Sequence, residues 1–365
     1  MNNNIKRVWL LSDTHLGCRA NSVLWLDIIE DYFFNFFIPL AKKEYKKGDV
    51  LFHLGDVFDN RQSLNLAAQN LGIRIFEELS KIFPDIHIIV GNHDIMRKNS
   101  NDISSVDCLK YIPNVSVHKN PKIIDYDGTK CLLMPWRRNS EHEKETLDQI
   151  KENIDYMFCH TETQGVQISP SKKYLHEGGN LPSVFKRFKR VYSGHIHYRQ
   201  ELDNFILVGN PYQMTRSDRD NQKGIYILDL KTGDHSFTPN KRSPEFKRYY
   251  INDILERRMD EISDEIKGNF VDVFIPSNVL GKYNINGFMD YLDGKAYKLE
   301  PRIFDENSQH ELDDTSVSDF NGQIDLLKIS KDYINSLDYD DDLKERLIKS
   351  VTDLYKQTLT PSYEN

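Results

Sequence analysis

Five short apolar segments within residues 1–200 are each followed at once by a cluster of Asp, Asn or His residues, and this alternation constrains the fold most. The apolar segments span residues 8–11, 50–54, 86–90, 156–159 and 190–193, and the clusters after them are Asp13-Thr14-His15, Gly55-Asp56-Val57-Phe58-Asp59, Gly91-Asn92-His93-Asp94, His160 and Gly194-His195-Ile196-His197. Each segment has the length and apolar content of a buried strand. Because ligand sites of open α/β sheets assemble at the carboxyl ends of strands, we expect the five clusters to meet at one edge.

The remainder of residues 1–240 fits the same α/β domain. The spacing of apolar residues predicts helices over residues 24–45, 64–82 and 141–153, and shorter apolar runs predict further strands over 115–118, 122–126, 130–135, 205–208 and 224–229. An Asp127-Gly128 pair between two of these runs predicts a hairpin turn. Pro, Asn, Lys and Ser cluster over residues 239–244, which predicts the end of the domain.

Residues 245–304 have the pattern of a small second domain, in which strands over 247–252, 270–275 and 296–303 alternate with helices over 254–266 and 285–292. The acidic residues 305–322 follow as a linker. Residues 323–365 hold two helical patterns, over 324–337 and 343–359. These helices could pack against their own domain, but a helical pair behind an acidic linker is more easily explained as a partner-binding tail.

Composition argues against several classes of protein. The most apolar run, residues 32–38, is far shorter than the roughly 20 residues that a membrane helix needs, and residues 1–7 lack the apolar core of a signal peptide. The four cysteines, Cys18, Cys108, Cys131 and Cys159, show no C-x-x-C spacing. A disulfide framework or a zinc–thiolate site is therefore not expected, and a reducing cytoplasm is the expected location.

The net charge of −8 argues weakly against nucleic acid as a partner. The acidic residues, however, gather in residues 300–320, where Arg302 is the one Lys or Arg. Basic pairs lie elsewhere, at Arg137-Arg138, Lys186-Arg187, Lys189-Arg190, Lys241-Arg242 and Lys247-Arg248. A basic face therefore remains available for phosphates, although any single pair is more simply explained as a solvated surface.

Two Asp, one Asn and four His residues of the clusters can bind a metal ion, and no Cys is among them. Such oxygen and nitrogen ligands suit Mn²⁺, Fe²⁺, Zn²⁺ or Mg²⁺. Seven ligands are too many for one tetrahedral ion but suit two ions that share a carboxylate. Each motif alone has an ordinary explanation, since Gly and Asn favour turns, and His53, His87 and His118 within strands are expected to be structural. Five motifs in order, each after a strand, favour a metal centre.

The order of the motifs, D-x-H, G-D, G-N-H-D, H and G-H-x-H, resembles that of the calcineurin-like metallophosphoesterase superfamily. The second motif and its flanks resemble the SbcD and Mre-eleven nucleases of double-strand-break repair, and Pro135-Trp136 and residues 331–335 are similar to the recombination nuclease subunit of large tailed phages. The resemblance implies an α/β fold, with a β-sandwich flanked by helices, residues 245–304 as a small α+β capping domain, and a C-terminal helical pair. If a phage encodes the chain, the expected location is the cytoplasm of its bacterial host.

The resemblance also implies roles for the site residues. One divalent ion is held by Asp13, His15, Asp56 and His197, and a second by Asp56, Asn92, His160 and His195, with Mn²⁺ the expected metal and Mg²⁺ the alternative. His93 is then the catalytic residue, which faces the scissile phosphate and stabilises or protonates the leaving oxygen. Asp59 supports the second motif, where many relatives carry His. Asp94 either orients His93 or caps the following turn.

The implied function is metal-dependent hydrolysis of DNA phosphodiesters, as exonuclease and endonuclease, in double-strand-break repair and recombination. The implied partners are DNA ends and an SMC-like ATPase of the SbcC type, which binds the C-terminal helices of a homodimer within a heterotetramer, with no membrane involved. Two alternatives stay open. One is a metallophosphatase or nucleotidase of the same superfamily, since Gly55 to Arg61 partly matches the signature G-D-x-x-D-R-G with Asn60 interrupting it. The other is a non-catalytic DNA-end-binding scaffold, against which the complete ligand set argues.

Overall fold

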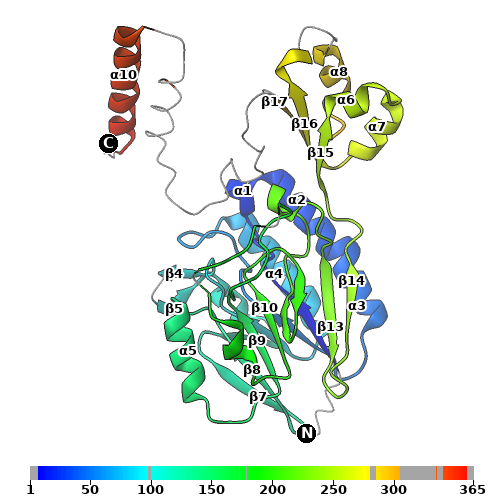
Figure 1. Ribbon diagram of the computed structural model, residues 1–365. Coiled ribbons are helices and arrows are strands. Elements are labelled where there is room, and N and C mark those ends of the chain that lie inside the picture. The colour runs from blue at the N-terminus through cyan, green and yellow to red at the C-terminus, as the bar shows by residue number, and fades with distance from the viewer. Residues whose placement is uncertain are drawn as a thin grey trace. The chain divides into compact units, whose positions relative to one another are not determined.

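Two six-stranded sheets form the larger part of the fold in the computed structural model, which describes residues 7–97, 100–171, 173–177, 179–279, 285–304, 334 and 340–359 (Figure 1). The first sheet has the order β14-β13-β1-β2-β3-β6, with β1 at Arg7–Leu11, β2 at Val50–His53, β3 at Ile86–Ile89, β6 at Val115–His118, β13 at Gly224–Asp229 and β14 at His235–Pro239. The second has the order β11-β12-β10-β9-β8-β7, with β7 at Lys122–Tyr126, β8 at Thr129–Met134, β9 at Tyr156–His160, β10 at Arg190–Gly194, β11 at Gln200–Leu202 and β12 at Phe205–Leu207.

The central strands are apolar on both faces, so each sheet can pack against its partner sheet on one side and against helices on the other. On β1, Val8 and Leu10 belong to the core between the sheets, which Phe158 of β9 shares. Trp9 and Leu11 alternate with them and belong to the core on the outer face. The expected β-sandwich is therefore confirmed.

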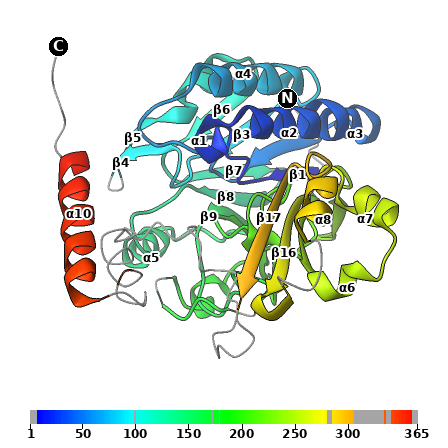
Figure 2. The ribbon, with the colours of Figure 1, turned by 90° about the horizontal axis from the view of Figure 1, so that it is seen from above.

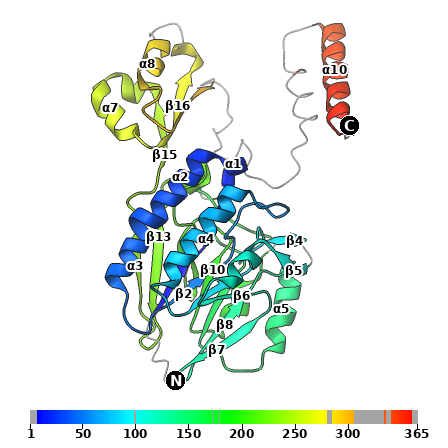
Figure 3. The same cartoon turned by 180° about the vertical axis from the view of Figure 1, so that it is seen from behind.

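Helices cover the two outer faces of the sandwich (Figures 2 and 3). The first sheet is covered by α2 (Val23–Tyr32), a π-helical turn (Phe33–Phe37), α3 (Ile38–Glu44) and α4 (Leu66–Ser80), and the second by α5 (Ser140–Gln149). The long helix predicted over 24–45 is thus a helical run with a π-helical turn. That turn falls just before Pro39, whose missing N–H interrupts the regular hydrogen-bond ladder.

Several short elements were not predicted from the sequence. They are α1 (Cys18–Asn21), the hairpin strands β4 (Ile95–Arg97) and β5 (Ser100–Ser104), the strands β11 and β14, and the 3-10 turns Ser105–Tyr111, Pro182–Phe185, Arg216–Asp218 and Ser277–Val279. The strands β4 and β5 are mostly exposed and polar, so they lack the apolar alternation on which a sequence prediction depends. The predicted hairpin at Asp127-Gly128 is confirmed, since both residues have the positive φ that a tight hairpin turn needs.

Residues 246–304 form a three-stranded parallel sheet of β15 (Phe246–Tyr250), β16 (Phe270–Pro276) and β17 (Lys298–Phe304), with α6 (Ile251–Leu255), α7 (Met259–Ile266) and α8 (Ile285–Leu292) packed on it. This module has an apolar core of its own. The single helix expected over 254–266 is wrong, because Arg258 has an extended backbone that separates α6 from α7. The break lets both short helices bury their isoleucines in the core of the module.

Contacts within the compact unit of residues 1–311 join the module to the sandwich. The ring of Phe270 stacks on Trp25 of α2, with ring centroids 5.1 Å apart. Arg216, between β12 and β13, donates to Asp272 of β16 at 2.6 Å and to Glu300 of β17 at 2.6 Å. A stacked aromatic pair and a branched ion pair therefore connect the two parts.

Residues 312–365 form a second unit, in which the structure describes α10 (Asp341–Leu359). This helix agrees with the helical pattern predicted over 343–359. The predicted acidic linker over 305–322 and nearly all of the helix predicted over 324–337 lie outside the described residues. Among the helices that the structure describes, none is long and apolar enough to cross a membrane.

Candidate metal centre

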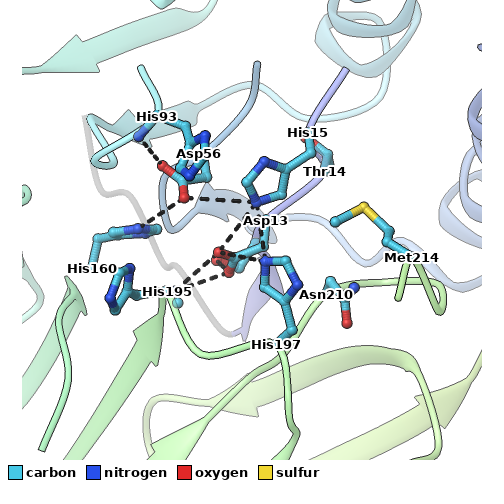
Figure 4. A network of polar contacts seen from close by, with 12 residues as sticks. Asp13, Thr14, His15, Asp56, His93, His160, His195, His197, Asn210 and Met214 are labelled. Carbon is cyan, nitrogen blue, oxygen red and sulfur yellow. Dashed lines mark hydrogen bonds and ion pairs between the residues drawn. The ribbon is translucent and has the colours of Figure 1, made fainter. Parts of the chain in front are cut away.

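The five polar clusters meet at one end of the sandwich (Figure 4). Three of them follow β1, β2 and β3 of the first sheet, and two follow β9 and β10 of the second. The expectation that one sheet edge carries all five is therefore corrected. The candidate ligands come from the ends of two facing sheets, which surround the site from opposite sides.

The loops that carry the clusters are held by unusual backbone conformations and by one another. Asp13, His15, Asp56 and His195 all have a positive φ, between 43° and 80°. The N–H of Asp13 donates to the carbonyl of Gly55, and that of His15 donates to the carbonyl of Asp56. Non-glycine residues rarely adopt this region, and they cluster at functional sites where the surrounding structure enforces it.

The first group of potential ligands consists of Asp13, His15 and His197, whose ligand atoms all lie within 4.8 Å of one another. The Nε2 atoms of His15 and His197 are 3.1 Å apart. Asp13 is fully buried, and its Oδ1 lies 3.9 Å from the Nε2 of each histidine.

The second group consists of Asp56, His160 and His195, again with ligand atoms within 4.8 Å of one another. The Oδ1 of Asn92 lies 2.8 Å from Nε2 of His160 and 2.8 Å from Nδ1 of His195. Asp56 also approaches the first group, because its Oδ2 is 3.3 Å from His160 and 3.7 Å from His15. All seven side chains that the sequence singled out as ligands are thus brought together, with Asp56 between the two groups.

The electrostatics of the centre favour bound positive charge. Burial lowers the pKa of His15, but the hydrogen bond to Asp59 and the charges of Asp56, Asp59 and Asp13 outweigh it and raise that pKa to about 9. Burial likewise lowers the pKa of His160, but the charge of Asp56 outweighs it, and the result is again about 9. The buried carboxylates therefore stabilise positive charge at His15 and His160.

Asp59, His93 and Asp94 of the second and third motifs lie beside the two groups, and Asp59 and His93 form a third group of potential ligands with His15. Nδ1 of His93 is 2.8 Å from the carbonyl of Asp59, and the backbone N–H of His93 donates to Oδ1 of Asp56 at 2.7 Å. Nδ1 of His15 is 3.1 Å from Oδ1 of Asp59. The carboxylate of Asp94 accepts from the backbone N–H groups of Gly91 and Phe58, so its contacts are those of a turn cap that braces two motifs.

Glycines in the motifs allow the loops to approach closely. A Cβ on Gly91 would lie 2.2 Å from Oδ1 of Asp56, and a Cβ on Gly55 would lie 2.5 Å from Nδ1 of His160. These distances are far below van der Waals contact, so only glycine fits at either position.

The three histidines expected to be structural lie within strands. Nε2 of His53 is 3.0 Å from Oγ1 of Thr14, and Nδ1 of His87 is 2.8 Å from Nε2 of His118. His53 is fully buried, and His87 is nearly so. The groups of potential ligands found among the described residues contain none of the three.

The sequence did not point to several residues that border the centre. Oε2 of Glu162 lies 3.4 Å from Nε2 of His195, and the ring of Trp136 lies 4.8 Å from that of His195. Asn210 and Met214 lie beside the first group (Figure 4). Glu162 stands two residues after His160, which is the spacing that puts two side chains on the same side of an extended chain. That spacing is the one signal that could have identified it.

Comparison with known proteins assigns the family. Residues 6–199 match the model of the calcineurin-like phosphoesterases, and the chain belongs to this family, whose members bind divalent metals. The chain is also 27% identical over 352 residues to "Exonuclease subunit 1" of Enterobacteria phage T4, which covers 94% of this chain and 97% of that protein. The resemblance to the metallophosphoesterases and to a phage nuclease subunit, expected from the motifs, is confirmed.

The matches among solved structures are more distant. The phosphopantetheinyl hydrolase of Mycobacterium tuberculosis is 13% identical, with 58% of this chain and 92% of that chain covered and a TM-score of 0.36. An archaeal phosphodiesterase is 14% identical, with 64% and 99% covered and a TM-score of 0.32.

Proposed function

We propose that this chain is a metal-dependent DNA nuclease, which hydrolyses phosphodiester bonds as the nuclease subunit of a recombination and repair complex. The observation that carries the proposal is the convergence of seven Asp, Asn and His side chains into two groups that meet at Asp56. The similarity to a phage exonuclease subunit along nearly the whole chain supports a nucleic acid as the substrate.

The residues fit two divalent cations. Asp13, His15, Asp56 and His197 would hold one ion, and Asp56, Asn92, His160 and His195 would hold the other, with Mn²⁺ or Mg²⁺ as the metal. Two facing imidazole nitrogens 3.1 Å apart, as in His15 and His197, need a proton or a cation between them. When bound, the two ions would activate water and neutralise charge on the phosphoryl oxygens.

Carboxylates behind the histidines would orient them. Asp59 lies at Nδ1 of His15, and Glu162 lies at Nε2 of His195, so in each ring the opposite nitrogen is turned toward the centre. Such carboxylate–histidine pairs fix the orientation of a ligating imidazole and raise its basicity.

His93 would act on the leaving group rather than on a metal. The carbonyl of Asp59 can only accept a hydrogen bond, so Nδ1 of His93 carries its proton and Nε2 is the atom left for the substrate. In the imidazolium form, Nε2 can donate to the leaving oxygen of the phosphodiester, which resists departure as an alkoxide.

We further propose that residues 245–304 cap the nuclease domain at residues 1–240 and that residues 323–365 bind an SMC-like ATPase. The helix α10 carries apolar residues at helical spacing, among them Leu343, Leu347 and Val351, which are only half-buried. An apolar stripe of this kind favours docking in a partner's groove. Deletion of residues 323–365 should abolish binding to the ATPase while the nuclease activity toward a small diester remains. Retained ATPase binding would contradict the assignment of the tail.

The proposal is tested most simply with two small substrates in Mn²⁺. A nuclease should hydrolyse bis-p-nitrophenyl phosphate far better than p-nitrophenyl phosphate, whereas a phosphatase or nucleotidase of the same family should prefer the monoester. Asn60, which interrupts the phosphatase signature, and the additional module at residues 245–304 favour the diester. Preference for the monoester would support the alternative function.

A further inference from the structure

The segment Trp136-Arg137 continues the end of β8 beside the second group of potential ligands. In the parallel pairing of β8 and β9, Met134 at the end of β8 lies opposite Cys159, so the residues that follow β8 continue toward His160. The backbone N–H of Trp136 donates to the carbonyl of Val90 at 2.8 Å, which ties the segment to the third motif. Its ring lies 4.8 Å from that of His195 and 6.1 Å from that of His160. The position of Trp136 is therefore fixed from several sides.

Arg137 directly follows Trp136, and its positive charge is not fully balanced by acceptors around it. The side chain is half-buried, and its Nε is covered without a hydrogen-bond acceptor among the described residues. An arginine stays protonated under all ordinary conditions. A covered donor that belongs to a charged group and lacks an acceptor is costly, so an anion bound at the terminal nitrogens of the guanidinium would offset part of this cost.

Three of the other basic residues noted in the sequence have partners within the fold. Arg242 donates to Asp31 at 2.8 Å, and Lys189 lies 2.8 Å from Asp155. Lys247 donates to the carbonyl of Glu265. These three side chains stabilise the protein's own structure. Arg137, which directly follows the tryptophan at His195, is a candidate for contact with substrate.

Glu143 of α5 is the acidic residue whose charge acts on Arg137. Its Oε2 accepts from Oγ1 of Thr161 and from Nδ2 of Asn180, the latter at 2.7 Å. Among the described residues, Glu143 and Arg137 do not form an ion pair within 4.0 Å. Burial raises the pKa of Glu143 to about 7, so near neutral pH it is only partly ionised. Glu143 therefore neutralises Arg137 incompletely.

We propose that Arg137 binds the phosphate that neighbours the scissile phosphodiester in the substrate strand, and that Trp136 holds it there. Arg137 is one residue, about 3.8 Å along the backbone, from the tryptophan that contacts His195. The guanidinium can present two parallel N–H donors to one phosphate. This inference rests on the proposed nuclease function, and it adds that the site also recognises a neighbouring phosphate of the substrate strand.

The test uses a dinucleotide with one internal phosphodiester and the same dinucleotide with an added 5′- or 3′-terminal phosphate. Hydrolysis in Mn²⁺ is measured for the full chain and for Arg137→Gln, Arg137→Lys and Arg138→Gln, and kcat/KM is compared between substrates. The unsubstituted protein should prefer one of the phosphorylated forms by about 10- to 100-fold, as expected for a charge-assisted hydrogen-bond pair. Arg137→Gln should collapse that ratio to near one, and Arg137→Lys should retain part of it.

Arg138→Gln is the matched control, because it removes the same charge from an exposed neighbouring side chain and should keep the full preference. If Arg137→Gln keeps the preference, or lowers kcat/KM for all substrates in proportion to a loss of thermal stability, Arg137 only stabilises the structure near Glu143 and the inference is wrong. If the unsubstituted protein cleaves all dinucleotides equally, the inference fails but the proposed function stands. Cleavage of monoesters alone would overturn the proposed function itself.

Discussion

At the scale of single residues, Asp56 lies between the two groups of candidate ligands. Its Oδ2 lies within 4 Å of a histidine from each group, and its Oδ1 accepts from the backbone of His93. Burial raises the pKa of Asp56, but the charge of His160 outweighs it and holds that pKa well below the usual range. One ionised carboxylate therefore links the two groups of ligands to the residue that we place at the leaving oxygen.

His93→Ala separates chemistry from metal binding. The side chain of His93 contacts the Asp59 carbonyl, and its role in the account is proton donation, so both metals should still bind while kcat falls by about 10²- to 10⁴-fold. Metal content by mass spectrometry and hydrolysis of a small diester measure the two effects. His176→Ala, which alters an exposed histidine, should change neither. A parallel fall of metal content and activity would assign His93 to metal binding.

Gly91→Ala should disrupt the centre through sterics alone. Its added methyl group would meet Oδ1 and the backbone nitrogen of Asp56 at 2.2 and 2.3 Å, so the second motif must move. We expect metal affinity to fall by more than tenfold, as measured by calorimetric titration with Mn²⁺. Gly128→Ala, in a hairpin with open space around it, should cost some stability without changing metal affinity. Equal affinities for Mn²⁺ in the two variants would contradict the steric argument.

The sequence predicted the side chains of the centre far better than it predicted their surroundings. Asp13, Asp56, Asn92 and the four histidines were identifiable because each follows an apolar strand in a recognisable motif. Trp136 and Glu162 were not singled out for the site, since a lone Trp or Glu at a strand end has many ordinary explanations. Their proximity to His195 depends on how two sheets pack, and no local pattern encodes that packing.

At the scale of elements, the loop between β12 and β13 contacts the backbone of His197, a candidate ligand of the first group. Asp218 is fully buried and pairs with the equally buried Lys223, whose Nζ is 2.7 Å from Oδ1 of Asp218. The same Nζ donates to the carbonyl of His197 at 2.6 Å. The buried ion pair thus holds the backbone of a proposed ligand in place.

Asp218→Asn should lower the free energy of unfolding by about 3–5 kcal/mol, because it leaves Lys223 buried without its counter-charge. Asp220→Asn, at an exposed neighbour, should cost no more than about 1 kcal/mol. Adding Lys223→Met to Asp218→Asn should recover part of the loss. Urea unfolding at pH 7 measures all three, and an additive double variant would argue against the pair.

The same pair predicts a pH dependence. Burial raises the pKa of Asp218, but the charge of Lys223 outweighs it and lowers that pKa to about 2. A depressed pKa in the folded state adds stability that is complete above the ordinary value near 4 and is lost as the pH falls through about 2. The difference between the original protein and Asp218→Asn should therefore be smaller at pH 3 than at pH 7.

Prediction of whole elements succeeded where the pattern was strongly apolar. The strands β1, β2, β3, β9 and β10 and the helices α4 and α5 lie within a few residues of the expected ranges. The hairpin of β4 and β5 was missed because it is polar and exposed. The break between α6 and α7 was missed because the extended backbone at Arg258 has no signal in the apolar pattern. The division of the five motif strands between two sheets was not predicted, because the pairing of strands far apart in the sequence leaves no local pattern.

At the scale of the whole molecule, the module at residues 246–304 has its own core but shares an aromatic stack with the sandwich. Phe270 lies between Phe246, 4.8 Å away, and Trp25 of α2, 5.1 Å away, with nearly parallel rings. The branched ion pair of Arg216 with Asp272 and Glu300 adds a polar connection. The module can therefore be uncoupled from the sandwich by changing few side chains.

Phe270→Ala should weaken this connection by about 3–5 kcal/mol while the metal centre stays intact. Hydrogen exchange should become faster in β15, β16 and β17 and stay unchanged in β1 and β2, and affinity for Mn²⁺ should not change. Ile303→Ala, at an exposed position of β17, is the control and should have little effect. Equal loss of protection in β1 would indicate that the sandwich and the module unfold as one unit.

Cleavage of linear duplex DNA in Mn²⁺ by the full chain and by Asp56→Asn is the most direct test of the central claim, that a two-metal centre built around Asp56 hydrolyses DNA. We predict that the original protein degrades the duplex, that a chelator stops the reaction, and that Asp56→Asn, folded by circular dichroism, is inactive because both groups of ligands lose their shared carboxylate. Cleavage that survives Asp56→Asn, or a fully metal-loaded protein that binds DNA ends without cutting them, would contradict the account.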